Sequence, residues 1–201
     1  MNKEDISDEK ILPPPEYHEA WFAIPEIVKL GDPILRQVAP PITKIGADTR
    51  KIVAFMIDVL HKARGLGLAA PQVGISQRLF VYDLGEGVQV AINPQILGMK
   101  GEQIGVEGCL SIPGLLGDVP RANELRLKAF DERGRPFTRK ASELEARVIQ
   151  HEYDHLDGVL FFDKVIPETL DWSSLDEDED DDEGEEELKS RRSTRRRRRG
   201  K

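Results

Sequence analysis

Apolar side chains recur at helical spacing in the first third of the chain, at Ile52, Met56, Val59 and Ala63. This period of three to four residues predicts an amphipathic helix over residues 48–64. We expect Asp48 or Thr49 as its N-cap, because short polar side chains accept hydrogen bonds from the free N–H groups of a first helical turn. Gly65 is expected to stop the helix at its C-terminus.

Short runs with strand character follow this predicted helix. They occupy residues 79–84, 88–92, 124–130 and the PFTRKA region that begins at Pro136. The sequence DERG at 131–134 separates the last two runs, and Gly134 suits a hairpin turn. The middle of the chain is therefore predicted to form antiparallel strands.

A second helix is predicted from Ser142 to about Leu156. Ser142 and Glu145 stand in the S-x-x-E relation of a capping box, and Gly158 is placed to end the helix. One stripe of this helix carries Leu144, Val148, His151 and His155. Since that stripe should face the core, we expect an α+β fold in which antiparallel strands pack around a buried helix.

The length of 201 residues suits one domain with appendages. We expect a flexible N-terminal arm at residues 1–22, which hold three consecutive prolines and many charges, and a folded body at residues 23–172. Residues 173–201 have almost no apolar side chains and should be a disordered tail.

Charge is segregated within that tail: residues 176–187 are acidic and residues 191–201 are basic. The formal net charge of −8 argues against a body that grips nucleic acid. No stretch approaches the roughly 20 apolar residues of a membrane span. The opening ten residues are acidic, unlike a signal or transit peptide, so we expect a soluble, unexported protein.

The most specific pattern is HEYDH at residues 151–155, an H-E-x-x-H on a predicted helix. One helical turn brings the imidazoles of His151 and His155 to the same side, where they can bind one metal ion. Glu152 then lies next to a metal-bound water. A catalytic divalent metal needs three protein ligands, so a third must be found.

Candidates for the third ligand are few. No histidine follows His155, His18 lies in the predicted arm, and a surface role suits His61 better. Carboxylates downstream, such as Glu168, lie in solvated sequence. Cys109, the one cysteine, is the remaining candidate, because a thiolate is a strong ligand for late first-row metals; the alternative for it is a buried, inert thiol.

The glycine-rich sequence GLGLAAPQ at residues 65–72 has two interpretations. A dinucleotide-binding fingerprint requires a strand before it and a helix after it, whereas here a helix precedes and strand-like sequence follows. The simpler role of Gly65 and Gly67 is to let a substrate backbone lie against the loop.

Three motifs together resemble the signature motifs of the peptide deformylases, in the right order: GLGLAAPQ at 65–72, EGCLS at 107–111 and QHEYDH at 150–155. The similarity covers about residues 25–168. It implies a hydrolase that removes the N-formyl group from the formyl-methionine of nascent polypeptides in the bacterial cytoplasm. We expect a monomer with no membrane association. A general H-E-x-x-H metallopeptidase is the alternative, disfavoured because its downstream ligand is missing.

The resemblance implies that Cys109, His151 and His155 hold the metal and that Glu152 acts as general base and acid. Members of the family commonly use Fe(II) and can work with Ni, Co or Zn. The Cys-His-His set by itself would also suit Zn.

The resemblance further implies that the Gln72 amide and the Leu110 backbone N–H donate to the oxyanion of the intermediate. It adds that main-chain groups of Gly67 bind the peptide in an extended pose. Leu144 and Val148 are candidates for the slot that takes the methionine side chain, with ordinary core packing as the alternative.

Two features of the sequence, Glu107 and the C-terminal tail, each allow two interpretations. Glu107 either orients a ligand or forms a structural ion pair with Arg147. The tail is either a solvated extension or a ribosome-binding element, in which five consecutive arginines, Arg195 to Arg199, contact RNA phosphate.

Overall fold

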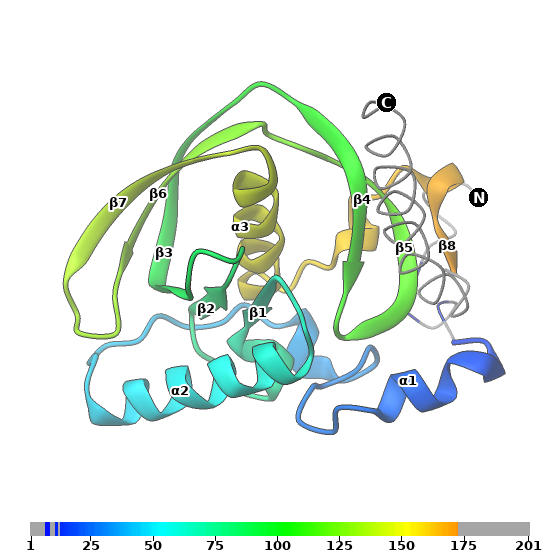
Figure 1. Ribbon diagram of the computed structural model, residues 1–201, viewed down its shortest axis with the longest axis horizontal. Coiled ribbons are helices and arrows are strands. Elements are labelled where there is room, and N and C mark those ends of the chain that lie inside the picture. Colours follow the sequence, from blue (N-terminus) through cyan, green and yellow to red (C-terminus); the bar gives the residue numbers. More distant parts are fainter. Residues whose placement is uncertain (1–6, 9–10, 12, 173–201) are drawn as a thin grey trace, which may run out of the picture.

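The computed structural model describes residues 7–8, 11 and 13–172. Two antiparallel sheets enclose a central helix, α3, which spans Glu143–Leu156. In Figure 1, strands β3, β6 and β7 lie to the left of α3, strands β4 and β5 lie to its right, and helix α2 crosses below. The α+β prediction, with strands around a buried helix, is confirmed.

The five-stranded sheet has the order β1-β2-β3-β6-β7, with every neighbouring pair antiparallel. Its strands are β1 Gly67–Ala69, β2 Leu79–Tyr82, β3 Gln89–Lys100, β6 Glu124–Phe130 and β7 Pro136–Ser142. The predicted strand at 124–130 matches β6, and Gly134 sits in the β6–β7 turn with a left-handed φ of 77°. Strand β3 extends eight residues beyond its predicted end at residue 92.

The three-stranded sheet has the order β4-β5-β8, with strands β4 Gln103–Cys109, β5 Ile112–Arg121 and β8 Asp171–Trp172. The sequence did not predict β4 and β5. In β4 the apolar Ile104 and Val106 face solvent while Glu107 is buried, which inverts the usual pattern. Strands β1 and β4 are each paired on one side, so in the described structure each has one free edge.

Helix α2, Ala47–Lys62, confirms the first predicted helix but not its caps. Its N-cap is Gly46 rather than Asp48 or Thr49, and the Thr49 hydroxyl accepts a hydrogen bond from the Gly46 N–H at 3.3 Å. The helix ends at Lys62, two residues earlier than expected, and Arg64, not Gly65, takes the left-handed conformation, with φ 51°.

Helix α3 confirms the second predicted helix, with Ser142 as N-cap, but the capping box is wrong. The Ser142 side chain makes no capping bond, and Glu145 instead accepts a hydrogen bond from the Tyr82 hydroxyl at 2.9 Å. Gly158 follows the helix with φ 71°, as expected of a C-terminal stop.

The N-terminal segment is partly packed. It forms the 3₁₀ helix Pro15–Tyr17 and helix α1, His18–Phe22, and it buries Ile11, Tyr17 and Trp21. The Tyr17 and Trp172 rings lie 5.1 Å apart between centroids. A flexible arm therefore does not describe these three residues, whereas the predicted tail at 173–201 lies outside the described residues.

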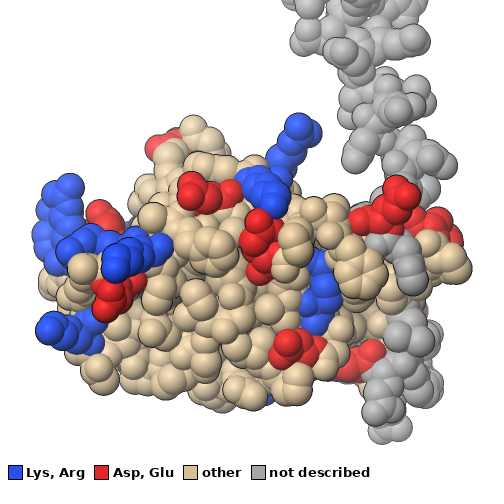
Figure 2. Space-filling model, turned by 90° about the horizontal axis from the view of Figure 1, so that it is seen from below, with Lys and Arg blue, Asp and Glu red and all other residues tan. Residues whose placement is uncertain are grey.

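Further 3₁₀ helices connect the main elements, at Pro33–Arg36, Ala70–Val73, Phe161–Asp163 and Pro167–Thr169. In the part of the chain that the structure describes, no helix has the length and apolar character needed to span a membrane. Figure 2 shows positive and negative side chains interspersed over the face that carries α2, with no broad area of one sign.

Candidate active site

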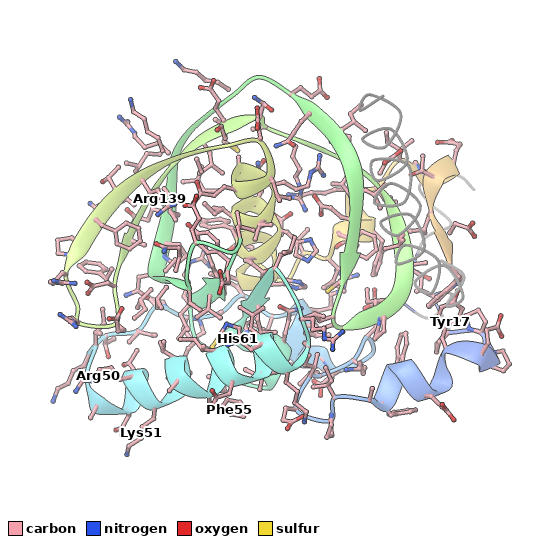
Figure 3. The ribbon with its side chains drawn as sticks, viewed as in Figure 1. Tyr17, Arg50, Lys51, Phe55, His61 and Arg139 are labelled. Carbon is pink, nitrogen blue, oxygen red and sulfur yellow. The ribbon has the colours of Figure 1, made fainter. Side chains whose placement is uncertain are left out.

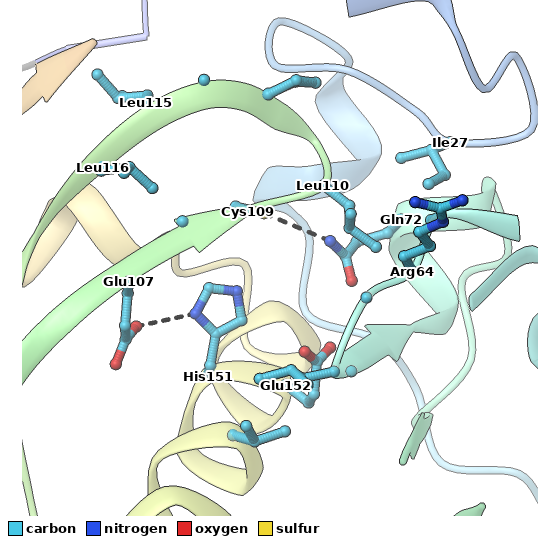
Figure 4. Close-up of a pocket in the computed structure, with 18 of the residues that line it drawn as sticks. Ile27, Arg64, Gln72, Glu107, Cys109, Leu110, Leu115, Leu116, His151 and Glu152 are labelled. Atoms are coloured by element: carbon cyan, nitrogen blue, oxygen red, sulfur yellow. Dashed lines mark hydrogen bonds and ion pairs between the residues drawn. The ribbon is translucent and has the colours of Figure 1, made fainter. Parts of the chain in front are cut away.

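A cavity of about 510 Å³ opens between the two sheets, above the start of β1. Its walls come from the segment before the 3₁₀ helix Pro33–Arg36, the loop between α2 and β1, Gln72, strand β4, the β4–β5 turn, the start of β5 and helix α3. The three sequence motifs that were singled out all contribute to it. Figure 4 shows Cys109, Gln72, His151 and Glu152 around the same space.

Three side chains that could hold a metal ion converge beside this cavity, and two of them, Cys109 and His151, line it. Cys109 ends β4, and His151 and His155 lie one turn apart on α3. The Cys109 Sγ is 3.4 Å from His155 Nε2, which is 3.2 Å from His151 Nε2. Among the described residues, these are the three side chains that could share a metal ion, since their donor atoms all lie within 4.8 Å of one another.

The donor atoms fit a divalent cation. Tetrahedral bonds of about 2.0–2.3 Å place neighbouring ligand atoms roughly 3.3–3.6 Å apart, close to the separations found here. One thiolate and two imidazoles are ligands for late first-row metals such as iron and zinc.

The electrostatics of the two histidines differ. Burial, with the neighbouring His151, lowers the pKa of His155 well below its ordinary value, so this imidazole is neutral and able to coordinate. Burial also acts to lower the pKa of His151, but hydrogen bonds to Cys109 and Glu107 outweigh it and raise that pKa to about 10. A cation therefore has to displace a proton from His151, and metal binding should release protons.

Glu107 performs both of the roles between which the sequence could not decide. Its Oε2 lies 2.9 Å from His151 Nδ1, which leaves His151 Nε2 directed at the other ligands. Arg147 donates to its Oε1 at 2.7 Å, and Arg121 donates to both oxygens at 2.9 and 2.8 Å. Burial alone would raise the pKa of Glu107, but the contacts with Arg121 and His151 lower it to about 2, so the carboxylate stays ionised.

Arg121 is a site residue that the sequence analysis missed. Besides Glu107 it contacts Asp154 at 2.5 Å, and Asp154 in turn contacts Lys164 at 2.7 Å. Asp154 precedes His155 on α3. The buried Arg121 guanidinium therefore links β5 to Glu107, which contacts His151, and also to the helical turn that carries His155. The sequence around Arg121 has neither helical periodicity nor strand alternation of apolar residues, so it did not indicate this contact.

Glu152 is buried beside the donor cluster, and its Oε2 has no hydrogen-bond partner among the described residues. Burial raises the pKa of this carboxyl to about 7, although His151 acts to lower it. Gly67 lies directly against it: a Cβ at position 67 would fall far inside contact distance of Glu152 Oε1. Any larger residue at 67 would therefore have to displace the Glu152 side chain.

Gln72 is held so that its amide nitrogen points into the cavity. Its Oε1 accepts a hydrogen bond from the Ala69 N–H at 2.8 Å, and its Nε2 lies 3.4 Å from both Cys109 Sγ and Ser111 Oγ. Figure 4 draws the contact to Cys109 as a dashed line. Leu110 borders the same space, and a Cβ on Gly65 would come within 2.8 Å of its Cδ1.

The remaining predicted residues are placed as follows. Leu144, which is 50% exposed, and Val148, which is buried, both line the cavity, as do Gly65 and Gly67. His61 lies elsewhere, on the solvent-facing side of α2, with its Nε2 3.4 Å from Asp83 (Figure 3). The dinucleotide interpretation fails, because α2 precedes the glycine-rich loop and only a short strand and one 3₁₀ turn follow it.

Comparison with known proteins agrees with this geometry. The sequence model of the polypeptide deformylase family matches residues 24–170. A peptide deformylase of Pelotomaculum thermopropionicum is 48% identical over 143 residues, which are 71% of this chain and 92% of that protein. The crystal structure of peptide deformylase from Thermotoga maritima has a TM-score of 0.69 at 42% identity and covers 70% of this chain and 97% of its own. A Synechococcus elongatus peptide deformylase in complex with actinonin gives 0.68 at 44% identity, with coverage of 69% and 79%.

Proposed function

Since the chain belongs to the polypeptide deformylase family and is a metal-dependent hydrolase, we propose that Cys109, His151 and His155 hold its metal. The observation that carries this proposal is the convergence of their three donor atoms within 4.8 Å, beside the cavity that Cys109 and His151 line together with other motif residues. When bound, a divalent metal supplies Lewis-acid chemistry, which lowers the pKa of a coordinated water toward ~7.

Fe(II) is the metal that we propose for the working enzyme, with Zn, Ni and Co as substitutes. The soft thiolate of Cys109 favours late first-row ions over Mg or Ca, which prefer oxygen ligands. Elemental analysis of protein purified without oxygen decides the identity of the metal; a magnesium- or calcium-only protein would contradict the ligand assignment.

Glu152 is the proposed general base and acid. A carboxyl with a pKa near neutrality can take a proton from the attacking water and return it to the departing amine. Its buried Oε2, which has no partner among the described residues, is free to accept that proton. The close approach of Gly67 fixes the position of this carboxylate at the cavity wall.

Gln72 and the Leu110 backbone N–H are the proposed donors to the oxyanion that forms on the formyl oxygen. The Ala69 N–H holds the oxygen of the Gln72 amide, so the nitrogen must face the cavity. An amide donates without titrating, and its position is fixed before the reaction, which is the condition for strong stabilisation of developing charge.

The substrate is proposed to bind as an extended strand between the free edges of β1 and β4. Gly65 and Gly67 present bare backbone on the β1 side. Leu144 and Val148 border the cavity on the α3 side and provide apolar surface for the methionine side chain.

The reaction is tested by measuring formate release from formyl-Met-Ala-Ser and, in parallel, amine release from the unformylated peptide. The expected result is release of formate with no cleavage of the unformylated peptide. Peptide-bond cleavage without formate release would favour a general H-E-x-x-H metallopeptidase, which the family assignment does not favour.

We further propose that the enzyme works as a monomer in the bacterial cytoplasm and that its tail binds the ribosome. The arginines at 195–199 would contact RNA phosphate, while residues 176–187 would compete for the same arginines. Deleting residues 173–201 should leave turnover of small formyl peptides unchanged and weaken co-sedimentation with ribosomes. Binding of the intact protein should fall steeply as salt rises; equal, salt-insensitive binding by both proteins would reject the proposal.

A further inference from the structure

The charges that line the cavity are unbalanced at its mouth. The charged side chains of the wall are Lys29, Arg64, Glu107, Arg147 and Glu152. Glu107 and Arg147 form a buried ion pair at 2.7 Å, and Glu152 lies deep in the site at 3% exposed. The two cations that remain, Lys29 and Arg64, have no carboxylate partner within the described part of the chain.

Arg64 reaches the cavity from the loop between α2 and β1. Its side chain is exposed, and its backbone φ of 51° is a conformation that residues other than glycine rarely adopt. Figure 4 shows Arg64 on the same side of the pocket as Ile27 and Leu110, away from Glu107. Its exposed side chain therefore lines the cavity on the side opposite Glu107.

Lys29 lies on the same side and is held more firmly. Its Nζ donates to the carbonyl oxygens of Ile27 at 2.9 Å and Ile24 at 3.4 Å. The backbone on either side is pinned to the active-site loops, because the Val28 N–H bonds to the Gln72 carbonyl at 2.8 Å and the Leu30 N–H bonds to the Ser111 carbonyl at 3.0 Å.

The environment of the Lys29 ammonium is partly apolar. Half-burial lowers its pKa, and the nearby Cys109 acts in the opposite direction. Its two carbonyl partners carry no net charge, so an anionic group that enters the cavity finds this ammonium uncompensated.

The distance from the reacting centre limits which substrate residues can meet these cations. Gly67 lies against Glu152, and Arg64 precedes Gly67 by three residues that turn from α2 into β1, so the two positions lie at most about 10 Å apart. A substrate strand advances by ~3.3 Å per residue. If its formyl-methionine lies at Gly67, its second to fourth residues therefore come within reach of the long Arg64 side chain.

We propose that Lys29 and Arg64 form a cationic rim that makes the enzyme prefer formyl peptides with acidic side chains at the third and fourth residues. This inference rests on the proposed extended binding of the substrate. Arg64 is exposed and is not one of the groups proposed to act on the formyl group, so its contribution should appear in KM rather than in kcat.

The test uses three C-terminally amidated peptides of the form formyl-Met-Ala-Xaa-Xaa, in which Xaa is Glu, Gln or Lys. For the full-length, metal-loaded enzyme, kcat/KM should fall in the order Glu, Gln, Lys. Partly exposed charge pairs are worth about 0.2–1 kcal/mol each, so Arg64→Gln should reduce the Glu-to-Gln ratio about two- to fivefold. Arg64→Glu should reverse the order of the Glu and Lys peptides.

Two further variants serve as controls. Arg64→Gly removes the charge at a position whose left-handed backbone favours glycine, so it should lower the ratio as Arg64→Gln does. Arg50→Gln removes an equal charge from the far end of α2 (Figure 3) and should leave the ratio unchanged.

Raising the salt concentration from about 0.05 to 0.5 M should shrink the preference, because screening weakens exposed charge pairs. The proposal would be overturned if the three peptides had equal kcat/KM. It would also be overturned if Arg50→Gln lowered the preference for the Glu peptide as much as Arg64→Gln does. Failure to release formate from any of the three peptides would instead overturn the proposed function.

Discussion

Strands β6 and β4 have the same length, and their side chains follow opposite rules. In β6 the buried positions are Leu125, Leu127 and Ala129, and the charged residues between them are exposed. In β4 the exposed positions include Ile104 and Val106, while Glu107 and Cys109 are buried. One strand builds a core against α3; the other buries the polar groups that the chemistry needs.

This contrast shows that the two sheets stabilise the protein by different means. The five-stranded sheet packs apolar side chains against α3, in a cluster with Phe80, Leu127 and Ile149. The three-stranded sheet faces α3 partly through hydrogen-bonded charges, chiefly Glu107 and Arg121. Variants in β4 should therefore affect metal and catalysis, and equivalent variants in β6 should affect stability alone.

The largest effect is expected from Cys109→Ala at the end of β4. Two imidazoles alone hold a divalent ion weakly, so metal and activity should be lost together. Cys109→Asp should retain some metal with a lower rate, because a hard ligand replaces a soft one. Metal content by elemental analysis decides the point: full occupancy in Cys109→Ala would remove Cys109 from the ligand set.

Next in size is the loss of the general base. Glu152→Ala leaves the three proposed ligands intact, so it should retain metal while kcat falls about 10²–10⁴-fold. Gly67→Ala tests the close approach of β1 to this carboxylate, since its new Cβ must push Glu152 aside. A displacement of about 1 Å can cost ~10²-fold in rate, so its kcat should lie between those of wild type and Glu152→Ala. Wild-type kcat in either variant would contradict the role assigned to Glu152.

The next prediction compares Glu107→Gln in β4 with Leu127→Ala in β6. Their effects should be smaller, but they distinguish the roles of the two strands. The first should weaken metal binding about 10–100-fold in a chelator competition, because His151 loses the partner that orients it. The second should cost about 2–5 kcal/mol in the free energy of unfolding and leave metal affinity unchanged. If both variants weakened metal binding equally, the division of labour between the strands would be wrong.

Acid titration provides a second measure of the same variant. The folded-state pKa of Glu107, about 2, lies below the usual value for an unfolded glutamate, ~4.3. Its ionisation therefore stabilises the fold above about pH 4.3, and this contribution is lost as pH falls toward 2. Urea midpoints measured between pH 5 and 3 should fall less steeply for Glu107→Gln than for wild type.

The smallest effect is expected from Ile104→Thr, on the outer face of β4. The side chain is 59% exposed, so the free energy of unfolding should change by less than about 0.5 kcal/mol. A loss of the size expected for Leu127→Ala would mean that the outer face of β4 is covered by another part of the protein.

The sequence predicted the elements in which apolar periodicity and burial agree. Helices α2 and α3 and strand β6 appear within a residue or two of their expected bounds. The two histidines proposed as ligands could be singled out because positions i and i+4 share a helical face, whatever the tertiary fold. Strands β4 and β5 were missed because buried charges and glycines replaced the apolar alternation on which strand prediction depends.

The sequence alone could not predict the roles of residues that act through partners distant in the chain. The contacts of Arg121 join positions 107, 121 and 154, and no local pattern announces such a pairing. Likewise, the left-handed turn fell on Arg64 although Gly65 stood next to it, since the path into β1, not the residue preference, fixed the end of α2.

The free edges of β1 and β4 bear on when a nascent chain can reach the proposed substrate site. A segment can enter between two strand edges only if its own backbone N–H and C=O groups are unpaired. An N-terminus already wound into a helix or added to a sheet does not meet this condition. If substrates bind between these edges as proposed, deformylation therefore competes with the earliest folding of the nascent chain.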